Sequence, residues 1–265
     1  MTPRNCRRAI FILTIAVLLA PLCWAQTGRE FHWSGKLAPE KIVEIKNING
    51  TIDAQMTGGD QVEVTAQKIG PHADEVKIEV VPHADGVTIC AIYSGGLFGG
   101  SGSCEPGERW HANNTHGDRT KVNFTVRLPE NLRFAGQSVN GDVKAQDMGR
   151  FVRASTVNGS VRVSTKAWAE LSSVNGSIEA SMGRADWTGI LKISTVNGSV
   201  KLEMPGNMNA DVRFRSVNGR LNTDFPLSVS GSLGGRKVEG RIGNGGRELV
   251  VETVNGNVEL KRESI

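Results

Sequence analysis

The chain has 265 residues, of which 22% are charged and 5% are aromatic, and its formal net charge is +4. This length suits one large all-β domain or two small ones. Three arginines and no acidic residues lie in the first 25 positions, so the rest of the chain carries 28 basic and 27 acidic residues, a net charge of +1. A nearly neutral chain of mixed charge gives no reason to expect nucleic acid or an anionic membrane as a partner.

The N-terminus, residues 1–25, has the layout of a secretory signal peptide. Arg4, Arg7 and Arg8 precede an apolar run over residues 9–22, and small-residue spacing predicts cleavage after Ala25. The run is too short for an ordinary membrane span. The alternatives are an uncleaved anchor and a lipoprotein signal, although the latter needs a small residue where Leu22 stands. We therefore expect an exported protein, periplasmic, extracellular or on the cell surface, without an integral membrane segment in the mature chain.

Residues 26–119 predict an irregular β cap. Short strands are expected at 42–45, 62–64, 76–80 and 87–89, with similar turns at 71–74 and 82–85. Residues 93–119 are rich in Gly, Ser, Asn and His, which indicates a long insertion loop. Cys6 and Cys23 would leave with the leader, so Cys90 and Cys104 are expected to form a disulfide at the base of this loop.

Residues 120–265 contain an internal repeat, Ser/Thr-Val-Asn-Gly, and a degenerate copy lies at residues 47–50. Successive motif asparagines from Asn140 to Asn218 are 18, 17, 22 and 21 residues apart, and the last step of 37 predicts two units, one without the motif. The turn residues are Asn49, Gly50, Asn140, Gly141, Asn158, Gly159, Asn175, Gly176, Asn197, Gly198, Asn218, Gly219, Asn255 and Gly256.

Apolar residues recur five and three positions before each motif valine and four and six positions after it, as with Val152, Ala154, Val161 and Val163 around Val157. This period of two predicts two short strands per unit, each with one buried face. Asn-Gly is expected to supply the turn because both residues tolerate positive φ.

Two architectures can use this unit: an antiparallel meander or sandwich of Asn-Gly hairpins, and a parallel β-solenoid with Asn-Gly corners. In a hairpin the motif valines would point outward, whereas at a solenoid corner they could turn inward and stack. Asparagines stacked along the axis could also form a hydrogen-bonded ladder. We expect the solenoid, continuous with the N-terminal cap as one domain.

The same residues carry a family resemblance. Residues 245–260, with Thr253-Val254-Asn255-Gly256, together with 122–129 and 42–50, resemble the bacterial "putative adhesin" β-strand-repeat family, whose function is unknown and which is related to the toast-rack domains of envelope proteins. The resemblance extends from residue 30 to 262. It implies an envelope-associated β-solenoid without an established enzymatic activity.

The sequence lacks the familiar patterns of hydrolases, phosphate loops, zinc proteases, calcium loops and dinucleotide sites. Three residue sets could still carry chemistry, and each has a plainer interpretation that we prefer: solvated loops, a mixed polar face, and core edges. The sets are His72, His83, His111 and His116 with Asp74 or Asp85 as metal ligands; the acids Asp142, Glu179, Glu203, Asp224 and Glu259; and Trp33, Trp110, Trp168 and Trp187 for sugar stacking.

We predict a non-enzymatic structural or interaction protein of the cell envelope, with no cofactor or metal, which binds an envelope protein or a glycan through columns of outward side chains. One such column is Lys144, Arg162, Glu179, Lys201, Asn222 and Glu259. The alternatives are an envelope-stress or signalling sensor domain and a carbohydrate-active solenoid enzyme.

Overall fold

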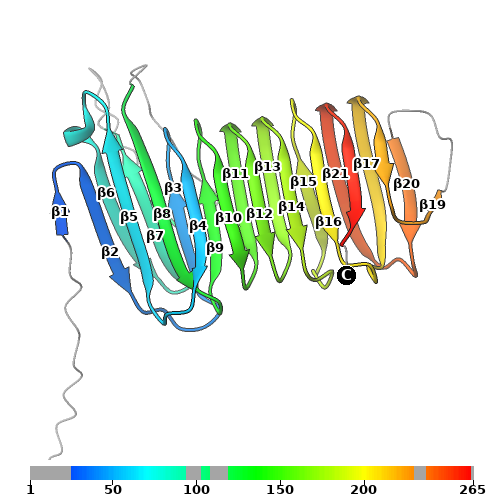
Figure 1. Cartoon of the computed structure of the whole chain (residues 1–265), viewed down its shortest axis with the longest axis horizontal. Coiled ribbons are helices and arrows are strands. Elements are labelled where there is room, and N and C mark those ends of the chain that lie inside the picture. Colours follow the sequence, from blue (N-terminus) through cyan, green and yellow to red (C-terminus); the bar gives the residue numbers. More distant parts are fainter. Residues whose placement is uncertain (1–24, 94–102, 108–118, 230–236, 264–265) are drawn as a thin grey trace, which may run out of the picture.

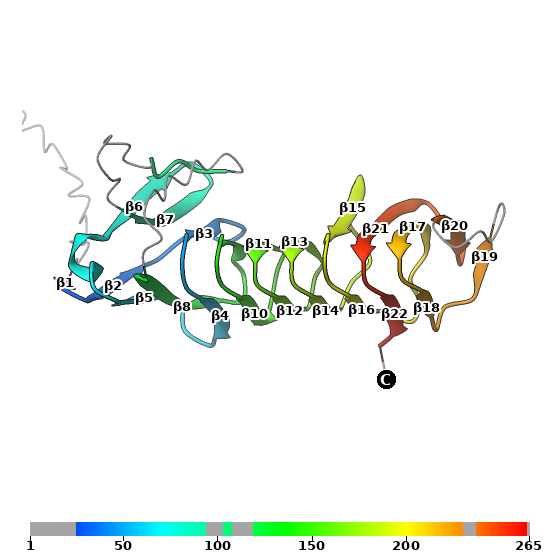
Figure 2. The ribbon, with the colours of Figure 1, turned by 90° about the horizontal axis from the view of Figure 1, so that it is seen from above.

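The computed structural model describes residues 25–93, 103–107, 119–229 and 237–263. Within these ranges the strands form two sheets of eleven that face each other along an elongated stack (Figures 1 and 2). In spatial order, sheet A contains β1 (Ala25–Thr27), β2 (Glu30–Gly35), β5 (Val62–Ile69), β8 (Lys121–Pro129), β4 (Ile52–Thr57), β10 (Val143–Met148), β12 (Val161–Thr165), β14 (Ile178–Met182), β16 (Val200–Met204), β22 (Val258–Arg262) and β18 (Leu221–Thr223). Sheet B contains β19 (Leu227–Val229), β20 (Lys237–Ile242), β17 (Ala210–Asn218), β21 (Arg247–Asn255), β15 (Ile190–Ser194), β13 (Ala169–Asn175), β11 (Val152–Asn158), β9 (Arg133–Gln137), β3 (Ile42–Lys46), β7 (Gly86–Ile92) and β6 (Lys77–His83).

The repeats form a parallel solenoid, as predicted. In each repeat the chain passes along sheet B, turns at Asn-Gly and continues along sheet A, so that one strand from each sheet makes a rung. The rung β11/β12 stacks in parallel on β13/β14, with Val152 opposite Ala169 and Val161 opposite Ile178. The hairpin alternative is wrong because the two strands of a repeat lie in different sheets.

The core fills the space between the two sheets. The apolar positions that recur around each motif are all buried there, as expected. These residues are Val143, Ala145, Val152, Ala154, Val161, Val163, Ala169, Leu171, Ile178, Ala180, Leu191, Ile193, Val200, Leu202, Val212, Phe214, Leu249, Val251, Val258 and Leu260. Burial of a Val or Leu side chain contributes roughly 1.5–3 kcal/mol, so this core is the main stabilising contribution.

The motif asparagines form a continuous ladder along one edge of the stack. Each side-chain amide donates a hydrogen bond to the amide oxygen of the asparagine on the next rung, for example from Asn175 to Asn158 (2.9 Å) and from Asn197 to Asn175 (2.8 Å). The ladder runs through Asn49, Asn140, Asn158, Asn175, Asn197, Asn255 and Asn218.

The motif Ser or Thr supplies a second bond between rungs. Its buried hydroxyl donates to the carbonyl of the motif glycine on the neighbouring rung, as Thr156 does to Gly141 (2.8 Å) and Ser173 to Gly159 (2.9 Å). Because buried polar groups are costly unless paired, Ser and Thr suit this inward position.

The motif glycines are required by close approach of the rungs. A Cβ on Gly176 would lie 1.9 Å from the carbonyl oxygen of Gly159, and a Cβ on Gly159 would lie 2.3 Å from that of Gly141. The expectation that positive φ explains Asn-Gly is wrong for this corner, since Gly50 alone of the motif residues has it, at 114°. Contact between backbones is the reason for glycine here.

Five of the six motif valines point outward, contrary to the sequence-based expectation, whereas Val139 is half-buried against the core and Ile48, at the same place in the degenerate copy, is buried in it. Strand β11 continues through Asn158, so its alternation places Thr156 inward and Val157 outward. Val157, Val174, Val196, Val254 and Val217 are 38–48% exposed and form a line that we call the valine ridge. The corner follows the asparagine, one residue later than an inward valine would require.

The C-terminal repeat stacks out of sequence order. Strands β21 and β22 lie between β15/β16 and β17/β18, so that Asn255 stands between Asn197 and Asn218. The prediction of two rungs between Asn218 and Asn255 is therefore wrong. The intervening chain forms β18 of the outermost rung, then the antiparallel strands β19 and β20, and returns into the stack.

At the other end, β3/β4 form the rung with Asn49-Gly50, and β7/β8 form the next. Strands β3, β5, β6 and β7 match the predicted segments, whereas β2 and β4 were not predicted. Residues 71–74 lead into a 3₁₀ turn, Ala73–Glu75, but Pro82 and His83 belong to β6. Within the described ranges no helix is long and apolar enough to cross a membrane.

A single added methyl group at the corner should measurably destabilise the fold. We expect Gly176→Ala to lower the free energy of unfolding by about 1–3 kcal/mol, because its Cβ meets the Gly159 carbonyl. Gly58→Ala is the control, since a Cβ there has no atom within 4 Å, and should change stability by less than about 0.5 kcal/mol. Urea unfolding followed by circular dichroism measures both, and equal midpoints would contradict the contact argument.

The asparagine ladder should contribute less than the glycine contacts, because its amides are exposed to water. Asn175→Ala removes the bonds to Asn158 and Asn197 and should cost about 1 kcal/mol. Asn222→Ala is the control, because this exposed side chain makes no hydrogen bond within the described part of the chain. Thermal unfolding compares the two, and an unchanged midpoint for Asn175→Ala would show that water replaces the ladder at no cost.

Candidate binding faces

The residues proposed as metal ligands do not assemble in the described part of the chain, where no group of three His, Cys, Asp or Glu could hold an ion. His72 contacts Glu75 (3.0 Å), and His83 contacts the Thr88 hydroxyl (3.2 Å). His111 and His116 lie outside the described residues.

The tryptophans are placed at core positions and edges. Trp33 and Trp187 are buried, and the indole nitrogen of Trp187 donates to the carbonyl of Glu248 (3.0 Å). Trp168 is partly buried against the Phe151 ring, with centroids 4.6 Å apart. Trp110 lies outside the described residues.

The candidate acids do not form one cluster. Glu179 and Glu259 share a column on sheet A, Asp142 accepts a hydrogen bond from the Ser160 amide (2.8 Å) and Asp224 from that of Arg262 (3.4 Å). Glu203 occupies the next outward column. In the described part of the chain, every carboxyl group whose pKa departs from its ordinary value has a lowered pKa. This direction is opposite to that of a general acid, whose pKa is raised.

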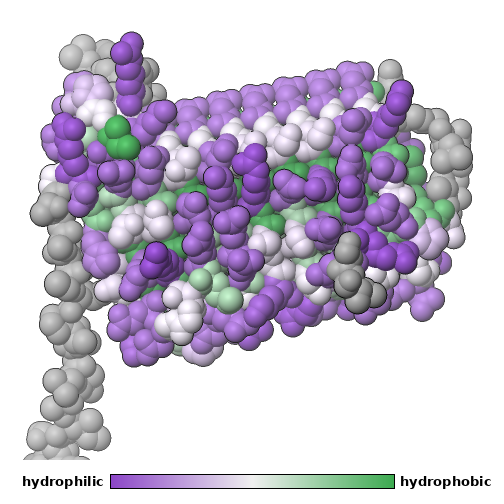
Figure 3. All heavy atoms as spheres, viewed as in Figure 1, coloured by the Kyte–Doolittle hydropathy of each residue, from purple (hydrophilic) through white to green (hydrophobic). Residues whose placement is uncertain are grey.

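The outer column predicted on sheet A is in continuous register. Lys144, Arg162, Glu179, Lys201, Glu259 and Asn222 lie opposite one another on adjacent strands. Lys201 donates to Glu179 (2.9 Å), and this hydrogen bond lowers the pKa of the Glu179 carboxyl. Figure 3 shows this face as mainly hydrophilic, with a regular hydrophilic row along the edge of the Asn-Gly corners. Arg162 and Glu259 pair instead with residues outside the column, Asp142 (3.7 Å) and Lys261 (3.6 Å).

The outer face of sheet B differs, because a groove runs beside the valine ridge. Its floor is a column of serines, Ser155, Ser172 and Ser194, which are paired in register on β11, β13 and β15. The far wall consists of Arg153, Glu170 and Lys192, and Gln137 lies at one end. This serine groove has a volume of about 340 Å³.

The charges around the serine groove are paired with each other. Arg153 bonds Glu170 (2.9 Å), and Lys192 and Arg215 both bond Glu252, at 2.9 and 3.0 Å. The hydrogen bond from Lys192, with the nearby Arg215, lowers the pKa of Glu252. The groove therefore combines hydroxyl groups and methyl groups with little unpaired charge.

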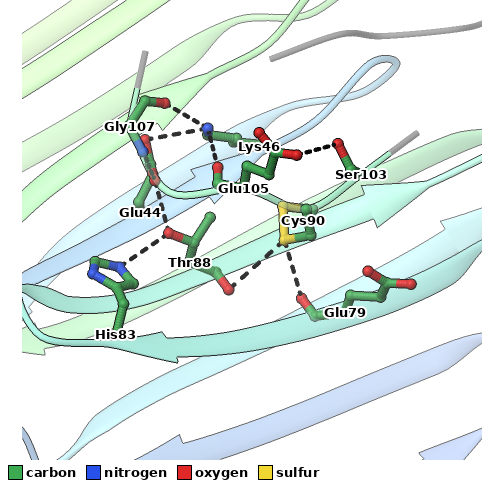
Figure 4. Close-up of a disulfide and its surroundings, with 10 residues drawn as sticks. Glu44, Lys46, Glu79, His83, Thr88, Cys90, Ser103, Glu105 and Gly107 are labelled. Atoms are coloured by element: carbon green, nitrogen blue, oxygen red, sulfur yellow. Dashed lines mark hydrogen bonds and ion pairs between the residues drawn. A yellow bond between two sulfur atoms is a disulfide. The ribbon is translucent and has the colours of Figure 1, made fainter. Parts of the chain in front are cut away.

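At the N-terminal end of this face the chain covers its own sheet (Figure 4). Lys46 stands opposite Gln137, in the same column as the serines, and is fully buried under residues 103–107. Its ammonium group donates to the carbonyls of Glu105 (2.6 Å) and Gly107 (2.5 Å) and lies 3.6 Å from Glu44. Burial lowers the pKa of Lys46, and Glu44 opposes this shift.

The disulfide anchors the covering segment. Cys90 and Cys104 are bonded, with 5.7 Å between their Cα atoms, and Glu44 accepts hydrogen bonds from the Gly107 amide (3.1 Å) and the Thr88 hydroxyl (2.8 Å). The remainder of the predicted insertion loop lies mostly outside the described residues. Sequence reasoning missed Glu44 and Lys46, because strand alternation places them outward and only residues 103–107 bury them.

The comparisons with known proteins agree with this geometry. A sequence profile of the Toastrack DUF4097 family matches residues 112–261, more than half of the chain. A search of curated protein sequences gives no match.

Solved structures also match this chain, including the following two. One is a "putative cell adhesion protein" from Clostridium sporogenes ATCC 15579, with a TM-score of 0.50 and 11% identity over 89% of this chain and 100% of that chain. The other is a "putative adhesin" from Bacteroides fragilis NCTC 9343, with a TM-score of 0.38 and 12% identity over 88% of this chain and 98% of that chain. On the match to residues 112–261, the chain belongs to the Toastrack DUF4097 family.

Proposed function

We propose that this protein is a non-enzymatic, exported component of the cell envelope that binds an extended segment of another protein along the outer face of sheet B. The observation that carries the proposal is the valine ridge. Among the described residues, seven large apolar side chains are exposed, and five of them stand in this one line. Contiguous exposed apolar surface marks an interaction site more often than scattered apolar residues do.

The covered end of sheet B supports a polypeptide as the partner. Residues 103–107 already lie on this face. The side chain of Lys46 donates hydrogen bonds to two of their backbone carbonyls, those of Glu105 and Gly107. Lys46 is the first residue of an outward column that continues on adjacent strands with Gln137, Ser155, Ser172 and Ser194. A partner segment that continues along this column would find hydroxyl groups for its backbone and methyl groups for its apolar side chains.

The chemistry of the face restricts the partner. Since Arg153, Glu170, Lys192 and Glu252 are paired with one another, a partner gains little from net charge. The expected segment is extended and carries apolar side chains on one side. The disulfide suits an oxidising compartment outside the cytoplasm, and the Clostridium structure is named for cell adhesion.

A substitution series on the ridge tests the binding face. Because Val→Thr keeps the shape and removes a methyl group from each contact, V157T/V174T/V196T should weaken binding of the purified mature protein to envelope vesicles at least about tenfold. The matched control is R162Q/E179Q/K201Q, which alters the same rungs on sheet A and should bind within about twofold of wild type. Protease treatment of the vesicles should abolish binding.

A photo-crosslinking residue gives the direct contact. Ser172 and Ser181 are serines of the same rung, on sheets B and A respectively. Cross-links to a protein should form from position 172, disappear in V157T/V174T/V196T, and be absent from position 181. Equal cross-linking from both positions, or binding that survives protease treatment, would overturn the proposed face. Turnover of neutral or acidic glycans by the purified protein would overturn the non-enzymatic assignment.

A further inference from the structure

A second surface of different chemistry lies on sheet A, at the end opposite to β18. The outer face of β2, β5 and β8 contains a hollow of about 570 Å³, whose outward lining residues are Glu30, His32, Thr65, Gln67, Asn123 and Thr125. Over these strands purple, hydrophilic residues and pale residues of near-neutral hydropathy are mixed (Figure 3). We call this surface the polar hollow.

Strand pairing arranges its polar side chains in two columns. His32, Thr65 and Thr125 face one another on β2, β5 and β8, and Glu30, Gln67 and Asn123 do the same one step away. The three strands are bonded to each other through their backbones, so a ligand must be recognised by side chains. The columns present imidazole, hydroxyl and amide groups on rigid strands.

These side chains retain unused hydrogen-bonding capacity. Within the described part of the chain, the side chains of His32, Thr65, Gln67 and Thr125 make no hydrogen bond to another protein group. Asn123 accepts bonds from Thr51 through its amide oxygen (3.1 Å from the backbone nitrogen), which orients the amide and leaves its NH₂ group as a donor.

The hollow itself contains a single type of charged side chain, a carboxylate, although Lys121 and Arg127 lie at its margins on the same face of β8. No Lys or Arg is among the described residues that line the hollow, and its carboxylate, Glu30, would repel an anion. Beyond Asp53, by contrast, the same column continues as Lys144, Arg162, Glu179, Lys201 and Glu259. An uncharged ligand rich in hydroxyl groups matches the hollow.

We propose that the polar hollow binds a neutral oligosaccharide. Thr hydroxyls donate and accept, the Gln67 and Asn123 amides donate, and a sugar supplies both kinds of partner on adjacent carbons. Ile69, which is 45% exposed, follows Gln67 on the same face of β5 and offers an apolar contact to the sugar ring. The site is independent of the valine ridge, which lies on the other sheet.

Calorimetric titration of the mature protein with maltohexaose, cellohexaose, chitohexaose and hexagalacturonate tests this site. We expect at least one of the three neutral oligosaccharides to bind, with an affinity unchanged between low and high salt, and hexagalacturonate not to bind. T65V/T125V should weaken that binding at least about tenfold by removing two hydroxyls. T65S/T125S keeps both hydroxyls and should bind within about threefold of wild type.

Each result has a defined meaning. Failure of all three neutral sugars to bind, binding of hexagalacturonate alone, or wild-type affinity of T65V/T125V would overturn the proposal. Equal losses in the Val and Ser pairs would also count against it, since the hydroxyls would then not be the contacts. Thermal unfolding checks that the variants remain folded. V157T/V174T/V196T should retain full oligosaccharide affinity, so failure here and failure of the protein-binding face are distinguishable.

Discussion

The structure depends on the contact between glycine backbones at successive corners. The carbonyl of one motif glycine occupies the space where the Cβ of the next would stand, as at Gly159 and Gly176. The motif Thr or Ser and the Asn then bind across the same gap, one on the inner side and one on the outer side. Since a bulkier corner would separate the rungs, this contact sets the register in which both sheets are bonded.

That register gives the two outer faces their separate chemistry. Because every rung repeats the same alternation, one residue per rung enters each outward column, and substitutions along the column decide its character. On sheet A the column from Lys144 to Glu259 is charged and contains the Lys201–Glu179 ion pair, whereas its N-terminal continuation at Thr125, Thr65 and His32 is a hydrogen-bonding surface. On sheet B, valines and serines lie side by side. A single scaffold thereby carries surfaces suited to different ligands.

The sequence pattern predicts the two strands of each rung, but it does not predict the order in which the rungs stack. The spacing of Val152, Ala154, Val161 and Val163 around the motif is sufficient to predict two strands and their buried faces, but it fits a hairpin as well as a parallel stack. Of the two arguments that favoured the stack, the asparagine ladder is confirmed, whereas the inward valine is wrong. The outward direction of Val157 depends on where the strand ends, and a shift of one residue reverses it. The position of Asn255 depends on non-local pairing, which no local pattern encodes.

Among the candidate surfaces, too, some could be predicted from the local sequence pattern and others depend on contacts between distant segments. The charged column on sheet A could be predicted because it lies within regular repeats. The burial of Lys46 could not, since it depends on residues 103–107, which are distant in sequence. The polar hollow could not be predicted either, because it requires the antiparallel pairing of β2, β5 and β8, and β2 has no motif.

The out-of-order placement of β21 and β22 has a consequence for biogenesis. A nascent chain that has emerged only as far as residue 246 has two unpaired strand edges, at β15/β16 and at β17/β18, with no third rung to join them. Such edges are templates for aggregation, so the incomplete chain is vulnerable. The segment that forms β21 and β22 therefore joins the two parts of this end of the stack, and a chain that lacks it leaves both edges exposed.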